Sequence, residues 1–223
     1  MQKIALIYMG GTFGCIGEPL IPMPEQAFLP LLEKIIPPHL QVECFAAPSI
    51  KDSSACTAVD WLQLIQQIQQ LQHNNYQYFV IIHGTDTLSY AAATLARFLG
   101  DSCHAIITGS QYPLLNIEGN DTREFTDALG NLYLALEQVL KLPEGVYLAF
   151  HQQVFHAQTT LKVHTTELDA FTGIPATKEC LTSTHQFIVK DDHITQAAQL
   201  CVLNLMLQPI PQQQLILQLK NIL

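Results

Sequence analysis

Several side chains able to take part in nucleophilic chemistry lie within one short stretch, His83-Gly84-Thr85-Asp86-Thr87. The stretch follows a β-branched and aromatic run at residues 78–82, as expected of a buried strand. It precedes an Ala- and Leu-rich run at residues 88–96, in which the apolar residues have helical spacing. The pattern therefore predicts a turn from strand to helix, and in an open α/β sheet ligands bind at such turns.

Hydroxyl groups also follow two earlier strand candidates. Thr12 comes after the first apolar run of the chain, and Ser53 and Ser54 come shortly after the second. Parallel strands bring their carboxyl ends to one edge of a sheet. We therefore expect these three hydroxyls to lie near Thr85 and Asp86.

A threonine hydroxyl attacks a carbonyl carbon only when a nearby base removes its proton. A lysine can act as that base if its pKa is depressed, or if it passes the proton along while a carboxylate holds it. Asp86 offers the carboxylate, and Lys162, one of ten basic residues, is the candidate amine. Each residue alone has an ordinary explanation, as a turn, a helix cap or a surface lysine. The combination in this order is far more specific than any single member.

Metal chemistry is not indicated by the remaining histidines and cysteines. His151, His156 and His164 lie close together in sequence, but an ordinary polar environment explains them better than a metal site. The six cysteines form no CxxC pair and have no zinc-like spacing with histidine. We expect free thiols and no metal site.

The composition narrows the class of protein. The 223 residues are 48% hydrophobic and only 13% charged, which predicts a sizeable core. The net charge of −9 argues against electrostatic binding of nucleic acid or of an anionic membrane. The chain has no run of 18 apolar residues, and its start is too short for a secretory signal, so we expect a cytoplasmic protein.

The elements that position the candidate residues alternate between strand and helix, which predicts a mostly parallel sheet with helices on both faces. Strands are predicted at residues 3–9, 42–46, 78–82, 104–108 and 146–150, and helices at 25–36, 59–71, 88–96 and 125–140. Residues 17–24 are predicted to form a loop. Beyond residue 150 the weaker patterns favour short strands at 187–189 and 199–207, a turn at 191–192 and a helix at 211–223.

Together these residues resemble the L-asparaginase/glutaminase family of threonine amidohydrolases, closest to its cytoplasmic type. The resemblance covers roughly residues 3–172, and the order of the Gly-Gly-Thr and His-Gly-Thr-Asp-Thr motifs is highly specific. It is carried by Tyr8-Met9-Gly10-Gly11-Thr12, Asp52-Ser53-Ser54, Asp60-Trp61, His83-Gly84-Thr85-Asp86-Thr87, Thr108-Gly109-Ser110-Gln111, Asn120-Asp121-Thr122-Arg123, Lys162 with Thr165-Thr166, and Ala170-Phe171.

The resemblance implies an α/β fold and hydrolysis of L-asparagine to L-aspartate and ammonia through an acyl-enzyme. Thr12 would be the nucleophile, and Lys162 would tune Thr85 beside Asp86. The oxyanion would be met by backbone N–H groups near Thr85.

The substrate would be an amino-acid amide, a zwitterion that needs hydroxyl and N–H donors at one end and a carboxylate at the other. The resemblance implies that Ser53 and Ser54 hold its α-carboxylate and that Asp86 holds its α-ammonium. Further substrate contacts are expected from Gly11, Gly84 and Thr85.

Two departures from the family pattern concern the Thr12 side of the site. Leu20 falls where the family places a tyrosine that assists the nucleophile, and leucine cannot relay a proton. The family also has a second, smaller domain, through which a neighbouring subunit receives an acidic residue. We expect residues 1–185 to form the N-terminal α/β domain and residues 186–223 only a vestigial second domain, in a chain that forms a homo-oligomer.

Other functions fit some of the same features. A degenerate, non-catalytic binder of aspartate-like or asparagine-like ligands would explain Leu20. A subunit of a tRNA-dependent amidotransferase can use a related domain, but the acidic charge weighs against direct RNA contact. A bare nucleotide-binding module is weaker still, because neither GxGxxG nor GxxxxGK[ST] occurs.

Overall fold

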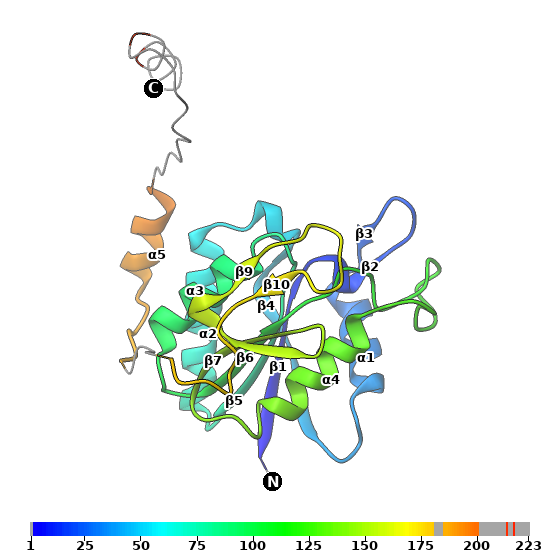
Figure 1. Ribbon diagram of the computed structural model, residues 1–223, viewed down its shortest axis with the longest axis horizontal. Coiled ribbons are helices and arrows are strands. Elements are labelled where there is room, and N and C mark those ends of the chain that lie inside the picture. Colours follow the sequence, from blue (N-terminus) through cyan, green and yellow to red (C-terminus); the bar gives the residue numbers. More distant parts are fainter. Residues whose placement is uncertain (1, 181–184, 201–212, 214–215, 217–223) are drawn as a thin grey trace.

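A computed structural model describes residues 2–180, 185–200, 213 and 216. Six strands form one central sheet in the order β4-β1-β5-β6-β7-β8, in which only β8 is antiparallel to its neighbour. The strands are β1 (Lys3–Gly10), β4 (Gln41–Lys51), β5 (Tyr78–Ile82), β6 (His104–Thr108), β7 (Gly145–Phe150) and β8 (Gln153–His156). The predicted mostly parallel sheet is confirmed (Figure 1).

Helices cover both faces of this sheet, as predicted. Ile7, Ile81 and Ile107 pack in one buried cluster with α2 and α3, whereas their neighbours Leu6 and Val80 pack in another with α1 and α4. Successive residues of each strand thus enter opposite layers, which is why the strands read as continuous apolar runs. The helices of these layers are α1 (Glu25–Ile35), α2 (Ala58–His73), α3 (Leu88–Leu99) and α4 (Ala128–Gln138).

The segment at residues 17–24 was predicted as a loop, and that prediction is wrong in part. β2 (Cys15–Ile16) pairs with β3 (Ile21–Pro22) in a small antiparallel hairpin directly after β1 and a short 3₁₀ helix at Thr12–Gly14. Only two residue pairs hold this hairpin. Such a short pairing leaves no alternation long enough to be recognised in the sequence.

Residues 187–200 also differ in structure from the prediction. Residues 187–189 form no strand, because Phe187 is held by the end of α3 instead: its N–H donates to the Phe98 carbonyl. The predicted turn at 191–192 is the first turn of α5 (Asp191–Ala198), where two acidic side chains suit a helix N-terminus. Gln199 and Leu200 form no strand, and the rest of the predicted elements at 199–207 and 211–223 lies almost wholly outside the described residues.

The described helices are all too short or too polar to cross a lipid bilayer. The division into residues 1–185 and 186–223 stays a prediction.

Candidate active site

Two glycine-containing turns meet at the carboxyl edge of the sheet. The five parallel strands follow the order second, first, third, fourth, fifth along the chain, so the winding direction reverses between β1 and β5. Ligands bind at such a switch point in open α/β sheets. The turns that flank it are in backbone contact: a Cβ on Gly11 would lie 2.3 Å from the Gly84 Cα. The next residue of each turn is a threonine, Thr12 and Thr85.

Lys162 joins Thr85 and Asp86 into one cluster. Its Nζ donates to Thr85 Oγ1 at 2.9 Å and to Asp86 Oδ1 at 3.0 Å. Lys162 belongs to β9 (Leu161–Lys162), which pairs with β10 (Phe171–Thr172), so a hairpin 77 residues away in sequence delivers the amine. The lysine side chain is 17% exposed and the Asp86 side chain 59%, so the pair opens toward solvent.

Ser53 meets this cluster through its own hydrogen bonds. The Asp86 N–H donates to Ser53 Oγ at 3.2 Å, and the Thr87 hydroxyl donates to the Ser53 carbonyl at 2.8 Å. Ser54 is turned away, since its hydroxyl donates to Asp52 Oδ1 at 2.6 Å. This bond and a second one from the Ser54 N–H lower the pKa of Asp52. Among the described residues the Ser53 hydroxyl proton has no acceptor and is available to a ligand, whereas the Ser54 proton is donated to Asp52.

A hollow of about 350 Å³ opens beside the Lys162–Asp86 pair. Its walls come from the start of α3 and from the segment that ends in β9; they comprise Asp86, Ser89, Tyr90, Ala93, Thr160, Leu161 and Lys162. The hollow is large enough for a small molecule next to both charges.

Gln111 bonds both Thr85 and the turn between β9 and β10, and it was not predicted as a site residue. The Thr85 hydroxyl donates to Gln111 Oε1 at 3.4 Å. The Gln111 Nε2 donates to the carbonyls of Thr165 and Glu167, at 3.1 and 2.9 Å, in the turn between β9 and β10. One amide thus connects Thr85 with the hairpin that carries Lys162. Its place just after the fourth predicted strand, at the same sheet edge, is the signal that could have found it.

Asp127 and Asn131 hold in place the turn at residues 109–112, which follows β6 and is called the Gln111 turn here. The Asp127 carboxylate accepts the backbone N–H groups of Gln111 and Tyr112 at 2.9 to 3.1 Å. The buried Asn131 donates to the Gly109 carbonyl and to Asp127, both at 3.0 Å, and accepts the His151 N–H at 2.9 Å. The sequence pattern showed only a helix here, because the network joins three segments that are distant in sequence, at residues 109–112, 127–131 and 151.

His83 is the buried polar residue at the centre of the turn, with an exposed fraction of 1%. Its Nε2 accepts from the Trp61 indole N–H at 3.3 Å, and its Nδ1 lies 2.8 Å from the Gly84 carbonyl. Burial lowers the pKa of His83, outweighing the hydrogen bond to Gly84 and the charge of Asp60, which act the other way. The imidazole is therefore neutral near pH 7.

The Thr12 side of the site has fewer contacts. Within the described residues, the Thr12 hydroxyl makes no hydrogen bond, and Thr12 is only partly buried. Leu20, which takes the place of the expected tyrosine, lies between β2 and β3 and is 48% exposed. The Gly11–Gly84 contact thus brings together the backbone just before Thr12 and the backbone just before Thr85, and the Thr12 hydroxyl has no hydrogen-bond partner among the described residues.

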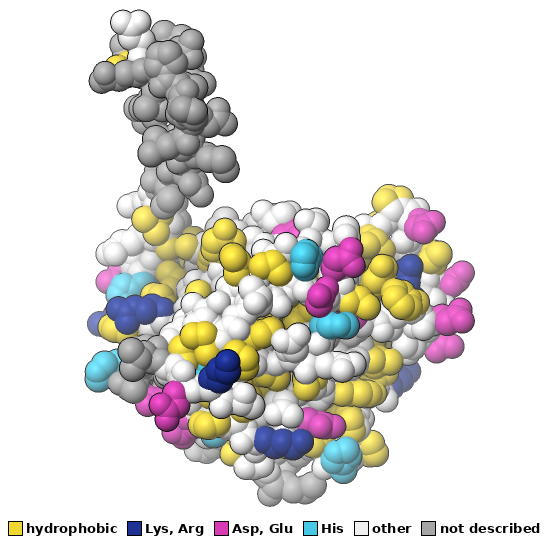
Figure 2. Space-filling model, viewed as in Figure 1, with side chains coloured by type: hydrophobic (Ala, Val, Ile, Leu, Met, Phe, Trp, Pro, Cys, Tyr) yellow, Lys and Arg dark blue, Asp and Glu magenta, His cyan; other side chains and the backbone are white. Residues whose placement is uncertain are grey.

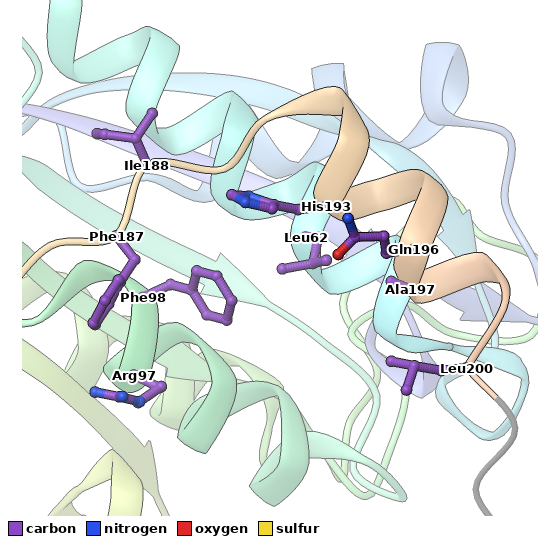
Figure 3. A pocket seen from close by; sticks show the side chains of 9 residues that line it. All are labelled: Leu62, Arg97, Phe98, Phe187, Ile188, His193, Gln196, Ala197 and Leu200. Carbon is purple, nitrogen blue, oxygen red and sulfur yellow. The ribbon is translucent and has the colours of Figure 1, made fainter.

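A second hollow, of about 530 Å³, shares no residue with this cluster. Figure 3 shows the Phe98 and Phe187 rings on one side of it and the α5 residues His193, Gln196 and Ala197 on the other. Lys and Arg side chains are scattered over the face drawn in Figure 2, among many hydrophobic ones. Among the described residues, no three His, Cys, Asp or Glu side chains could hold a metal ion.

Comparison with known proteins gives one consistent family. The family described as "Asparaginase, N-terminal" matches residues 3–194. L-asparaginase 1 of Escherichia coli K12 is 30% identical, with a match that covers 77% of this chain and 51% of that protein. The 60 kDa lysophospholipase of Mus musculus is also 30% identical, over 76% of this chain and 34% of that protein. The chain spans about half, or less, of the length of these curated relatives.

Solved structures agree with the sequence comparison. L-asparaginase I from Vibrio cholerae superposes with a TM-score of 0.64 at 29% identity, covering 77% of this chain and 51% of that chain. The L-asparaginase of Thermococcus kodakarensis superposes with a TM-score of 0.62 at 26% identity, covering 78% and 51%. The chain therefore belongs to the asparaginase family, and its residues 3–194 correspond to the N-terminal part of that family.

Proposed function

We propose that this chain hydrolyses the side-chain amide of L-asparagine to L-aspartate and ammonia. The observation that carries the proposal is the Lys162 Nζ, 2.9 Å from Thr85 Oγ1 and 3.0 Å from Asp86 Oδ1. A lysine that contacts both a hydroxyl and a carboxylate at the switch point is not needed to form a turn or cap a helix. Membership of the asparaginase family supports the same reaction class.

Substrate recognition would follow from the charges at the hollow. The exposed Asp86 carboxylate would attract the α-ammonium group, and the free Ser53 proton would donate to the α-carboxylate. For Ser54 to donate as well, its hydroxyl would have to leave Asp52, where it now lies at 2.6 Å. Gly11 and Gly84 would contribute by letting the two turns pack closely beside the substrate, because a Cβ on either glycine would clash with the opposite turn or with Ser53.

The reaction would proceed in two steps. Thr12 Oγ1 attacks the amide carbon, the C–N bond breaks, and the threonine proton leaves with the ammonia, which gives an ester on Thr12. Water then attacks the ester, one water proton returns to Thr12, and aspartate leaves. The oxyanion would accept from the Thr85 N–H, which has no hydrogen-bond partner within the described residues.

Thr85, Asp86 and Lys162 would assist by holding one hydroxyl oxygen ready to accept a proton. Thr85 Oγ1 accepts from Lys162 and donates to Gln111, so one lone pair remains for a proton in transit. Hydroxyls, an amine and a carboxylate supply all of this chemistry, so the proposed reaction needs no metal or organic cofactor.

A second candidate function is the binding of aspartate or asparagine without turnover. Leu20 favours it, because a leucine cannot assist Thr12 as the tyrosine of the family does. In this case the Thr85 side of the site would keep its ligand while the nucleophile stayed inactive.

Ammonia release from L-asparagine and L-glutamine by the purified chain tests the proposal, with the Thr12→Ala variant as control. We expect release well above the control with asparagine. No release above the control at high enzyme concentration would overturn it, and calorimetric binding of aspartate in that case would establish the second function.

We also propose that the chain works as a homo-oligomer in the cytoplasm. Partly exposed apolar residues such as Phe187 and Ile188 favour association, because large apolar patches are rarely left in water. The free thiols of Cys15, Cys44 and Cys103 suit a reducing compartment. Light scattering on the purified chain checks the association.

A further inference from the structure

The hydrogen bonds of His83 specify a single form of its ring. The Trp61 indole N–H can only donate, so the His83 Nε2 that it contacts at 3.3 Å must carry a free lone pair. The Gly84 carbonyl can only accept, so the Nδ1 at 2.8 Å must carry the proton. Both neighbours require the same neutral tautomer, with the proton on Nδ1. A ring placed only to fill space would not need two matched partners.

The last acceptor in this series of hydrogen bonds, the Gly84 carbonyl, belongs to a peptide group at the proposed reaction centre. The Gly84 carbonyl and the Thr85 N–H are the two ends of one peptide group. A donor at the carbonyl draws electron density toward oxygen, which makes the N–H of the same group a stronger donor. The Thr85 N–H is the group that the proposed function assigns to the oxyanion.

The surroundings keep this peptide group dry and fixed. His83 is 1% exposed, so water does not compete for its hydrogen bonds. The His83 N–H donates to the Thr108 carbonyl at 2.8 Å, and Gly84 lies between Gly11 and Ser53 without room for a Cβ. The direction of the Thr85 N–H is thus set by packing on both sides.

We propose that Trp61 and His83 are positioning residues that polarise the Gly84–Thr85 peptide and so strengthen Thr85 N–H as an oxyanion donor. The inference rests on the proposed amide hydrolysis for its catalytic meaning. The order of the bonds, from the Trp61 N–H through the His83 ring to the Gly84 carbonyl, stands on the geometry alone.

Nuclear magnetic resonance of the ¹⁵N-labelled chain tests the bonds without any turnover. We expect His83 with a protonated Nδ1 and an unprotonated Nε2. In Trp61→Phe, which removes the indole donor, the Thr85 amide proton and nitrogen should shift upfield. Tyr76→Phe is the matched control, because it also removes a hydrogen-bonding group from an aromatic residue, but one that contacts Glu43 near the amino end of β5. The opposite tautomer, or an equal shift in both variants, would overturn the proposal.

Kinetics test the consequence for catalysis. Removing the Trp61 donor should lower kcat about 3- to 10-fold in Trp61→Phe while KM stays unchanged. The reason is that a stronger Thr85 N–H donor stabilises the negative charge of the transition state more than it stabilises the bound substrate. His83→Asn keeps a donor at the place of Nδ1 and should retain kcat within about threefold, whereas His83→Leu should lose at least about tenfold. Equal losses in the two His83 variants would indicate packing alone and contradict the proposal.

Failure of the inference is distinguishable from failure of the proposed function. A wild-type chain without ammonia release but with the expected tautomer and Thr85 shift would remove the hydrolase and retain the polarised peptide. An active wild-type chain in which Trp61→Phe changes neither the Thr85 resonances nor kcat would retain the hydrolase and remove the role of Trp61 and His83. If His83→Leu fails to fold, Trp61→Phe decides.

Discussion

The two threonines at the carboxyl edge of the sheet are held in different ways. Thr85 Oγ1 lies 2.9 Å from Lys162 Nζ and 3.4 Å from Gln111 Oε1. Asp127 and Asn131 in turn hold the backbone around Gln111 through hydrogen bonds. Thr12 is placed only by its backbone, through the contact between Gly11 and Gly84, and its hydroxyl has no partner in the described part of the chain. The Thr12 side is thus positioned by its backbone, but no described side chain lies within hydrogen-bond reach of its hydroxyl.

This difference separates two requirements of a catalytic site. Backbone contacts fix where an atom lies, but proton transfer needs a second group within hydrogen-bond reach. The Thr85 side meets both requirements within this chain. The Thr12 side meets the first, and the Leu20 loop, which is exposed, does not supply the second.

The largest effect is expected from Thr12→Ala, which removes the proposed nucleophile. Activity should fall about 10³-fold or more, as when other nucleophiles are removed. The free energy of unfolding should change by less than about 0.5 kcal/mol, because the hydroxyl makes no hydrogen bond to any residue that the structure describes. Ammonia release and urea titration measure the two. A variant that keeps its activity would show that the nucleophile lies elsewhere.

Lys162→Met should lower kcat about 10²- to 10⁴-fold, the range of a lost proton-transfer group. Its effect on stability should be below about 1 kcal/mol, since Asp86, its ion-pair partner, is mostly exposed. Lys141→Met is the matched control, because that lysine pairs with Glu137 on the surface at 3.5 Å and should leave kcat unchanged. Equal activity in the two variants would contradict the account of Thr85.

Asn131→Ala tests the hydrogen bonds that hold the Gln111 turn in place. The change removes three hydrogen bonds and leaves buried partners unsatisfied, so the free energy of unfolding should fall by about 2 to 4 kcal/mol. Chemical denaturation measures this loss. A change below about 0.5 kcal/mol would mean that the network is not needed to hold the Gln111 turn.

Leu20→Tyr tests whether the Thr12 side of the site lacks only a hydroxyl partner. A tyrosine hydroxyl near Thr12 would supply the missing partner, and we expect kcat to rise up to about tenfold, less than a well-placed acid or base gives. Leu20→Phe adds the ring without the hydroxyl and should not raise kcat. A gain in both variants would point to packing of the hairpin instead.

The smallest effect concerns pH and His83. Its pKa in the folded chain is lowered, so below about pH 6.5 the unfolded chain takes up a proton that the folded chain does not. His83 therefore lowers stability as the pH falls, by up to about 1.4 kcal/mol per pH unit until its folded pKa is reached. His83→Asn should flatten the fall between pH 6.5 and 5. Identical slopes in wild type and His83→Asn would refute this.

Hydrophobic period and turn chemistry were sufficient to predict the main fold. The central strands and the four covering helices are strong local patterns, and β1, β4, β5, β6 and β7 follow the predicted alternation with those helices. The antiparallel β8 and the β2–β3 hairpin were missed, because their short pairings depend on contacts across the chain and not on local period. The predicted strand at 187–189 failed because Phe187 contacts the end of α3 instead, through its N–H to the Phe98 carbonyl and through its ring to the Phe98 ring.

The site was predictable where residues lie in the strand-end turns themselves. Thr85, Asp86 and Ser53 were predicted in this way, and the structure brings them together with Lys162, while their roles stay a prediction. Gln111 and the layer of Asp127 and Asn131 beneath it were missed, since amides and carboxylates in a loop and on a helix have many ordinary uses. Only the folded geometry brings Gln111 to Thr85, and Asp127 and Asn131 to the backbone around Gln111.

The central claim is that Thr12, placed by its backbone, attacks the amide held by the Thr85 side. Rapid acid quench of the chain with L-asparagine, followed by mass spectrometry of the peptides, tests this most directly. We predict an aspartyl ester on Thr12, absent in Thr12→Ala and present for longer in Lys162→Met. Ammonia release without an ester on Thr12, or with an ester on Thr85 instead, would contradict the account.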